Sequence, residues 1–174
     1  MNTLRAGPLL LEPLTVSHAQ AMFAVLGDPL LYRHLDQPPP PSLEHLQSVY
    51  ARLETRRSPH GRQQWLNWVV SLPGTPPFGY MQATVTEGGT AWIAYVLSSQ
   101  YWGHGHATQA MQAVVEHLAG HYGVTRYLAT VEAENRRSIG VLQRLGFRAA
   151  SEAELEGHDL SPTERLFVRH DPAL

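Results

Sequence analysis

The chain has no cysteine among its 174 residues. This absence excludes disulfide bonds, thiolate nucleophiles and cysteine-ligated metal sites. Charged residues are scarce as well, at 16% of the sequence, and the formal net charge at pH 7 is only -2. A balance so close to neutral argues against a general affinity for nucleic acids or anionic membranes. We therefore expect neither a nucleic-acid partner nor a membrane partner.

Long apolar segments are also missing. The apolar run within residues 1–15 is interrupted by Pro8, Glu12 and Pro13, which makes it a poor signal peptide, and no other run approaches membrane-spanning length. A cytoplasmic location is the expectation. A chain of this length can bury a substantial core without metals or disulfides. The sequence predicts one domain over residues 1–174, as a monomer or a homodimer.

Apolar residues recur with strand and helix periods along the chain. Short Gly- and Pro-rich turns separate the three strands in the middle of the chain, which favours antiparallel pairing. The strand, helix and strand within residues 91–132 predict a right-handed parallel crossover. Together these elements predict a mixed α/β (α+β) sheet with helices packed on it. The expected strands are 9–14, 65–72, 78–85, 91–98, 125–132 and 164–170, and the expected helices are 16–26, 43–57, 106–122 and 138–145, with Thr15 and Ser42 as caps of the first two.

One glycine-rich segment, QYWGHGHATQA at residues 100–110, joins the strand at 91–98 to the helix at 106–122. The N-terminus of a helix carries unpaired amides and a partial positive charge. Gly103 and Gly105 lack a Cβ atom, so a phosphate group could approach these amides closely. The alternative is that the two glycines only form a tight turn between strand and helix.

Three kinds of phosphate site compete for this segment. A Walker loop is excluded because the segment lacks the required lysine. A dinucleotide fingerprint needs a third glycine where Thr108 stands and an open parallel sheet, although Glu132 could imitate its ribose-binding acid. An acyl-CoA site places the pyrophosphate on a Gln/Arg-x-x-Gly-x-Gly/Ala turn. Gln100, Gly103 and Gly105 match that turn without a substitution.

Four stretches of the chain carry a resemblance to a known family. They are residues 9–35, 92–111, 124–135 and 135–147, the last with the pattern Asn-x-x-Ser-x-x-x-Leu-x-x-x-Gly-Phe. In this order they resemble the GNAT superfamily of acyl-CoA-dependent N-acetyltransferases. Within it, the chain resembles the RimJ/RimL-type branch, named for enzymes that acetylate the N-termini of ribosomal proteins.

The resemblance implies helices on both faces of the sheet and a V-shaped opening between the strand ending near Ser98 and the strand ending near Glu132. The pantetheine arm of acetyl-CoA, the implied co-substrate, lies in this opening, and the pyrophosphate lies on the glycine-rich turn. Asn135 matches the position that holds the cofactor arm, although it could also cap the next helix. The implied cofactor-binding residues are Val96, Leu97, Ser98, Gln100, Gly103, His104, Gly105, His106, Ala107, Thr108, Asn135 and Ser138.

Acetyl transfer to an amine requires deprotonation of the ammonium, stabilisation of the carbonyl oxygen and protonation of the departing thiolate. Relatives often carry a tyrosine acid at the position of Leu142 and a glutamate base at the position of Trp92, and neither side chain here can exchange a proton. The predicted catalytic residues are therefore Ser138 as proton donor and Glu132 as base. The alternative to Ser138 as proton donor is a water. The alternatives for the base are Glu134, His104 and a water relay.

Together these features predict an acetyl-CoA-dependent N-acetyltransferase in which a primary amine attacks the thioester directly. The acceptor is a peptide N-terminus or a small molecule. A catalytically weak acyl-CoA-binding module is the alternative from a different class, and the replacements at Trp92 and Leu142 favour it. Dinucleotide binding is the third hypothesis.

Other residues have two interpretations each. Tyr32, Arg33 and His34 lie where relatives shape the acceptor pocket, or they form a solvated loop. Arg136 and Arg137 could steer the 3′-phosphate of CoA, or they simply begin a solvated helix.

The remaining histidines and tryptophans of note have structural interpretations. His104 and His106 are too poorly spaced for a metal site, so we expect loop residues and no metal. We expect Trp65, Trp68 and Trp92 to be core or sheet-face aromatics.

Overall fold

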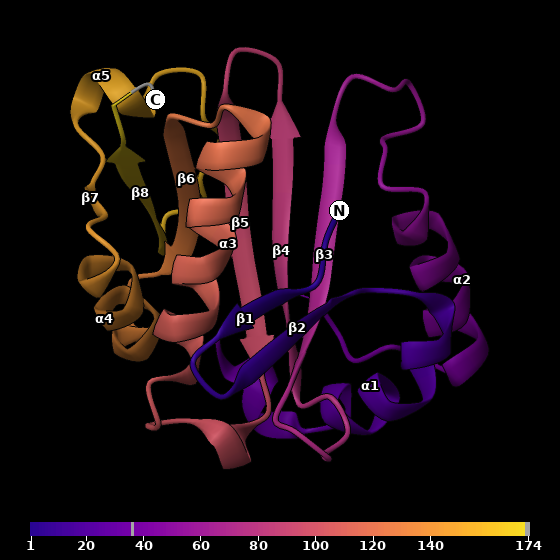
Figure 1. The fold of residues 1–174 in the computed structure, drawn as a ribbon. Helices are drawn as coiled ribbons and strands as arrows, with labels where there is room; N and C mark the ends of the chain where they lie inside the picture. Colours follow the sequence, from indigo (N-terminus) through magenta and orange to yellow (C-terminus); the bar gives the residue numbers. More distant parts are fainter. Residues whose placement is uncertain (36, 173–174) are drawn as a thin grey trace.

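A sheet of eight strands forms the centre of the protein (Figure 1). The computed structural model describes residues 1–35 and 37–172, and positions 36, 173 and 174 of the predicted domain lie outside this described part. The strand order is β1-β2-β3-β4-β5-β6-β8-β7. The strands are β1 Leu4–Ala6, β2 Leu9–Pro13, β3 Gln64–Ser71, β4 Gly79–Thr86, β5 Thr90–Leu97, β6 Arg126–Glu132, β7 Arg148–Ala149 and β8 Glu164–His170.

Two neighbouring strands, β5 and β6, run parallel, and the other neighbours in the described sheet are antiparallel. Helix α3, His106–Tyr122, makes the crossover between β5 and β6. The predicted mixed, mostly antiparallel fold with a central parallel β-α-β unit is confirmed.

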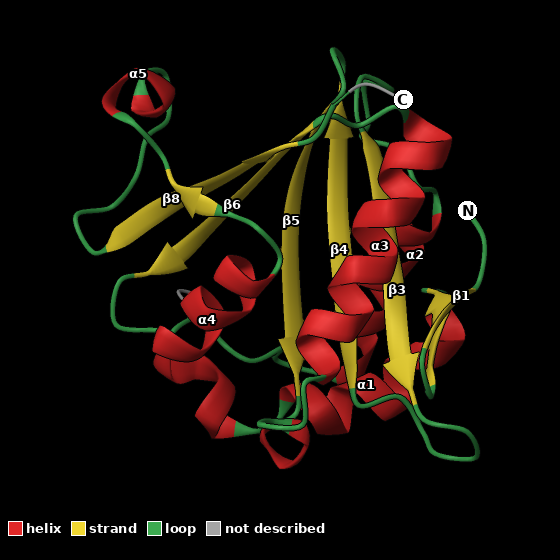
Figure 2. Ribbon diagram, turned by 60° about the vertical axis from the view of Figure 1, so that its left-hand side comes forward, coloured by secondary structure: helices red, strands yellow, loops and turns green. Residues whose placement is uncertain are grey.

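Helices cover both faces of the sheet, as the resemblance implied (Figure 2). Helices α1, Ala19–Leu26, and α2, Leu43–Glu54, lie on one face, whereas α3 and α4, Arg136–Arg144, lie on the other. Side chains alternate between these two cores along a strand. On β3, for example, Trp68 is buried with the residues of α3, and the next residue, Val69, is buried with those of α1 and α2.

The helix ends are set by local hydrogen bonds. The Ser42 hydroxyl accepts from the His45 amide (3.1 Å) and caps α2, as predicted. The first predicted helix, 16–26, begins instead with a 3₁₀ turn, η1, at Val16–His18. The His18 amide donates to the Thr15 carbonyl (3.1 Å) and closes the tighter turn, whose N-cap is Thr15. The Thr15 amide in turn donates to Nδ1 of His18 (3.0 Å).

Short elements were not predicted. They are β1, β7, the 3₁₀ turns η2, Pro29–Arg33, and η3, Ser99–Tyr101, and helix α5, Glu152–Leu155. Each is too short to show an apolar period. In addition, α5 depends on the cap at Ser151, and β7 depends on pairing with a later strand. Strand β7, for example, exists because Arg148 and Ala149 pair with Val168 and Phe167 of β8.

The sheet opens between β5 and β6. The two strands pair over three residues only, Thr90–Trp92 with Arg126–Leu128, while β6 pairs with β8 along its whole length. Beyond Trp92 the two strands diverge (Figure 2). This divergence is the predicted V-shaped opening.

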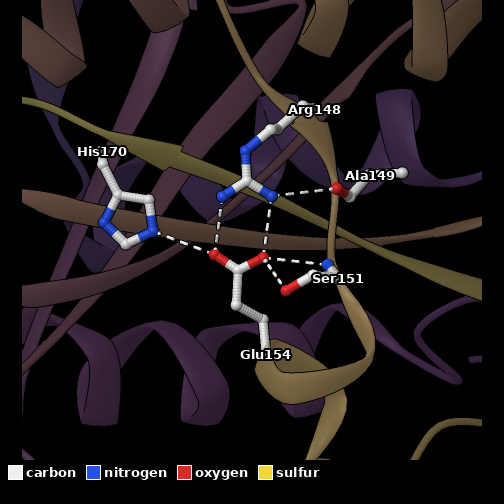
Figure 3. Close-up of polar contacts among 5 residues, drawn as sticks. All are labelled: Arg148, Ala149, Ser151, Glu154 and His170. Carbon is white, nitrogen blue, oxygen red and sulfur yellow. Dashed lines mark hydrogen bonds and ion pairs between the residues drawn. The ribbon is translucent and has the colours of Figure 1, made fainter.

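A charged cluster ties α5 to the edge of the sheet (Figure 3). The Glu154 carboxylate accepts two bonds from the Arg148 guanidinium (2.7 and 2.8 Å), one from the Ser151 amide and one from the Ser151 hydroxyl, and lies 3.1 Å from Nε2 of His170. These hydrogen bonds hold the pKa of Glu154 well below its usual range, and those from Arg148 have the largest effect. The cluster anchors the segment 150–163.

The anchored segment covers the face of β6 and β8 that lies opposite to α3 and α4. Ala150 and Leu160 pack there with Leu128, and the ring of His158 lies edge-on to Trp92 (5.3 Å between centroids).

Elsewhere in the fold, none of the helices in the described residues is long and apolar enough to span a bilayer.

Gly79 sits where β4 approaches the end of β5 most closely. A Cβ atom built there would overlap the Val96 carbonyl oxygen and the Leu97 side chain. We expect Gly79→Ala to destabilise the fold by about 1–3 kcal/mol, because the two paired strands cannot both keep their positions. Chemical denaturation measures this loss.

The matched control for this glycine is Gly120→Ala on the exposed side of α3. A Cβ atom there meets no atom within 4 Å, and alanine raises helix propensity, so the control should gain about 0.5–1 kcal/mol. Equal stability of Gly79→Ala and the natural protein would contradict the close approach of β4 and β5.

Candidate active site

A cleft of about 820 Å³ occupies the opening between the strands, bounded by β5, the N-terminus of α3 and α4. It brings together most of the predicted cofactor-binding residues. Ser98, Gln100, His104 and Glu132 lie outside its lining. The predicted residues that line it are Val96, Leu97, Gly103, Gly105, His106, Ala107, Thr108, Asn135 and Ser138.

The glycine-rich turn needs its glycines for their backbone conformation. Gly103 and Gly105 have φ angles of 81° and 77°, in the left-handed region that other residues rarely adopt. Gly105 is the N-cap of α3 and supplies no side chain to the helix end. A Cβ atom at either position would meet nothing within 4 Å, so the turn is also open on its outer side. The tight-turn interpretation and the phosphate interpretation therefore both fit.

The main-chain amides at this turn are free to bind an anion. Within the described residues, no amide from Gly103 to Thr108 donates a hydrogen bond to another protein group. Unpaired amides at a helix N-terminus attract negative charge. This run of amides lies beside the cleft, where a phosphate group could accept several hydrogen bonds from it.

Arginines add positive charge around the same cleft. Its lining includes Arg33, Arg136, Arg137 and Arg144 with a single carboxylate contributor among the described residues, Glu134. All 13 basic residues of the chain are arginines, and the guanidinium group binds phosphate oxygens in a bidentate manner. The electrostatics of the cleft favour an anionic ligand.

Arg144 is a phosphate-binding candidate that sequence analysis missed. Its Nε atom lies 3.4 Å from the Thr108 hydroxyl, so its side chain reaches from α4 to the first turn of α3. It passes over Gly140, one helical turn earlier, where a Cβ atom would lie 3.3 Å from the guanidinium. The spacing of Gly140 and Arg144 was the only hint of this contact in the sequence. It does not show that the Arg144 side chain reaches Thr108, because that depends on where α3 lies.

Two histidines and two aromatic residues flank the turn. The His104 and His106 rings stack at 5.5 Å, and Phe78 stacks on Tyr101 at 3.9 Å. Burial, and then the proximity of His104, lower the pKa of His106, which keeps that ring neutral at pH 7. No group of three potential metal ligands occurs among the residues that the structure describes.

The edge of β5 offers main-chain groups to the cleft. The Ser98 amide donates to the Phe78 carbonyl (2.8 Å), so Ser98 and Val96 direct their main-chain groups toward β4. Tyr95 and Leu97 alternate with them and face the opening. The Leu97 carbonyl accepts from the Trp102 indole (2.8 Å). An extended ligand could pair with this edge as a missing strand would.

Asn135 and Ser138 begin α4 on the opposite wall. The Asn135 side chain accepts from the Ser138 amide (3.1 Å), so it caps α4 and the helix starts at Arg136, two residues earlier than predicted. The Ser138 hydroxyl lies 2.8 Å from the Tyr95 hydroxyl. Sequence analysis missed Tyr95, because a strand tyrosine does not reveal what lies across the opening.

The remaining predicted catalytic position, Glu132, lies at the end of β6. Its carboxylate accepts from the Thr163 hydroxyl (3.2 Å). Leu142 is only 3% exposed and belongs to the core. Trp92 lies against His158 on the face of the sheet opposite to α3 and α4, and Trp68 is fully buried, so both are structural aromatics as predicted.

Segment η2 is fixed to the start of the glycine-rich turn. The Asp28 carboxylate accepts from the Leu30 amide (2.9 Å) and the Ser99 amide (3.1 Å). Hydrogen bonds from Ser99 and Leu30 lower the pKa of Asp28. Of the three residues predicted near the acceptor, Arg33 and His34 line the cleft, while the Tyr32 hydroxyl donates to the Leu26 carbonyl (2.6 Å).

This arrangement of splayed strands and open helix N-terminus agrees with a comparison against known families. Residues 8–148 match the profile described as an acetyltransferase (GNAT) domain. The chain therefore belongs to the GNAT acetyltransferase family, and the resemblance noted in the sequence is confirmed.

Solved structures of similar fold include two acetyltransferases of ribosomal-protein type. The acetyltransferase from Salmonella typhimurium that modifies the N-terminal serine of ribosomal protein L7/L12 has a TM-score of 0.81 and 18% identity, covering 98% of this chain and 100% of that one. RimJ of Mycobacterium smegmatis, in complex with a CoA-disulfide, has a TM-score of 0.78 and 28% identity, covering 97% and 86%.

A curated relative matches over a shorter segment. The N-acetyltransferase p20 of Bacillus licheniformis is 37% identical over 62 residues, which are 36% of this chain. The match spans about a third of that relative's length, 35%.

Asn135 has a helix-capping role that its substitution can separate from ligand binding. We expect Asn135→Ala to lose about 1 kcal/mol of stability, because the Ser138 amide loses its acceptor. Asn135→Ser restores a capping oxygen and should restore the melting temperature. It lacks the amide group, so we expect it to show a smaller CoA-induced rise in melting temperature than the natural protein. If Asn135→Ser recovers both the melting temperature and its full rise with CoA, Asn135 acts only as a helix cap.

Proposed function

We propose that the chain is an acetyl-CoA-dependent N-acetyltransferase that transfers an acetyl group to a primary amine. The observation that carries this proposal is the run of amides from Gly103 to Thr108 without protein partners, next to an unpaired edge of β5. CoA recognition has two parts: the free amides bind its pyrophosphate, and the β5 edge pairs with the amide groups of its pantetheine arm. Membership of the GNAT family supports the same activity.

The binding residues follow from the geometry of the cleft. The pyrophosphate binds the amides of the glycine-rich turn, with Arg144 and the arginines at the start of α4 nearby. The pantetheine arm pairs with the Tyr95–Leu97 edge of β5, and Asn135 holds it from the opposite wall. Ser98 and Gln100 do not line the cleft, so their contributions are indirect, whereas His104 contributes through its main-chain amide in the glycine-rich turn.

The chemistry combines positioning with proton transfer. Acetyl-CoA supplies a thioester that a neutral amine can attack. An open main-chain amide of the β5 edge stabilises the carbonyl oxygen, and the Ser138 hydroxyl protonates the departing thiolate. Glu132, at the end of β6, removes the proton from the amine. Holding the two reactants in place contributes much of the rate.

The acceptor is a peptide N-terminus or a small molecule. Acetylation of N-terminal serine by the Salmonella relative favours the peptide. Arg33 and His34 then contact the peptide chain beyond its amine. We place this activity in the cytoplasm, in a monomer or a homodimer.

Ligand binding is the first test of the proposal. We expect CoA to raise the melting temperature of the purified protein and NAD to leave it unchanged, because a ligand of the folded state stabilises it by mass action. A rise with NAD alone would favour dinucleotide binding. Neither ligand having an effect would refute the CoA site.

Turnover is tested separately from binding. We expect acetyl-CoA and a panel of peptide and small amines to release free thiol. The chain contains no lysine, so self-acetylation is confined to the N-terminal amine and the background is low. Stabilisation by CoA with no thiol release from any acceptor would identify the weak acyl-CoA-binding module instead.

Ser138 and Glu132 can be tested in the same assay. We expect Ser138→Ala and Glu132→Gln each to lower kcat by roughly 10²–10⁴-fold with little change in the KM of acetyl-CoA, since each removes one proton-transfer group. Glu134→Gln, in the cleft lining, is the matched control and should keep its kcat. A loss confined to Glu134→Gln would move the base from Glu132 to Glu134.

A further inference from the structure

We propose that Tyr95 is the proton reserve behind Ser138: the phenol donates to the serine oxygen and resupplies the proton that Ser138 gives to the departing thiolate. This inference rests on the proposed function. The two hydroxyl oxygens are 2.8 Å apart, and both residues line the cleft.

The contact crosses the opening in the sheet. Tyr95 lies on β5 beyond Trp92, where β6 has diverged, and its side chain shares a face with Ile93 and Leu97 toward α3 and α4. Ser138 lies in the first turn of α4. The Tyr95–Ser138 bond therefore joins the two walls of the cleft at the depth where the arm of the co-substrate is expected to end.

A serine hydroxyl alone is a poor acid for this task. Its alkoxide is much less stable than a phenolate, whereas tyrosine has an ordinary pKa near 10 and a thiol one near 8.5. A proton passing from Tyr95 through Ser138 to sulfur avoids the alkoxide. Ser138 loses one proton to the thiolate and gains one from Tyr95 in the same step, so it stays neutral.

The remaining protons balance. The transfer leaves CoA as a thiol, the acetyl group on nitrogen and Tyr95 as a phenolate. The amine releases one proton to its base, and this proton returns to Tyr95 through solvent. No oxidant, reductant or further reactant is needed.

The surroundings of Tyr95 suit a proton reserve. Burial raises the pKa of Tyr95, while the hydrogen bond with Ser138 and the positive charge of Arg144 lower it. The raised pKa keeps the phenol protonated at neutral pH. Arg144, from the last turn of α4, lines the same cleft, and its positive charge stabilises the transient phenolate.

A purely structural bond between β5 and α4 would also explain the short distance, so the test must separate the two roles. Tyr95→Phe keeps the ring and removes only the hydroxyl. We expect its melting temperature and its stabilisation by CoA to match those of the natural protein. We expect its single-turnover rate of thiol release to fall roughly tenfold or more, within the range of proton-transfer catalysis.

Two further measurements report on the proton path itself. The double variant Tyr95→Phe/Ser138→Ala should be no slower than Ser138→Ala, because the reserve acts only through the serine. In mixtures of H₂O and D₂O, the rate of the natural protein should depend on deuterium content in a curve, as two moving protons require, and that of Tyr95→Phe should depend on it linearly. A bond that only positions Ser138 also predicts the first result, but it predicts a linear dependence on deuterium content for both proteins.

A readout without turnover completes the test. The absorbance titration of Tyr95, obtained as the natural protein minus Tyr95→Phe, should move to higher pH when Ser138→Ala is introduced into both, because the serine no longer stabilises the phenolate. Tyr122→Phe, at the far end of α3, is the control for loss of a tyrosine hydroxyl and should keep full activity.

The outcomes distinguish this inference from the proposed function. Full activity of Tyr95→Phe in an otherwise active protein, additive losses in the double variant, or an unchanged titration would overturn the role of Tyr95 alone. An inactive natural protein would overturn the proposed function and this inference together.

Discussion

The site depends on main-chain groups that the fold leaves without partners. Buried amides and carbonyls are almost always hydrogen-bonded in proteins, so a strand edge and a helix end left open side by side are costly unless water or a ligand pairs with them. Here β5 loses β6 after Trp92, and α3 starts at His106 after the N-cap Gly105, which offers no side-chain acceptor. The sheet keeps its integrity because β6 continues its pairing with β8 instead.

Much of the fold followed from the sequence because its signals were local. The strands of the central meander are apolar segments separated by Gly- and Pro-rich turns. The apolar stripe of α3 ends at Gly123, whose φ of 62° suits a helix stop. The glycine-rich turn was also recognisable, since Gly103 and Gly105 adopt a conformation that the residue type itself indicates. Short elements such as β7 gave no such signal, because a neighbouring strand creates them.

The parts of the site that sequence analysis missed are contacts across the cleft. Tyr95 meets Ser138 over 43 positions of sequence, and Arg144 meets Thr108 over 36. Neither residue type nor spacing predicts such pairs, which exist only once β5, α3 and α4 converge. Leu142 is buried and carries no exchangeable proton, whereas the hydroxyls of Ser138 and Tyr95 meet between α4 and β5.

Asp28 joins two segments that are expected to serve different reactants. One carboxylate holds the Leu30 amide of η2 and the Ser99 amide that precedes the glycine-rich turn. A displacement of either segment must therefore strain or break a bond to the other. Any coupling that passes through this carboxylate is reciprocal, as linkage requires, and so it sets no order for the two reactants.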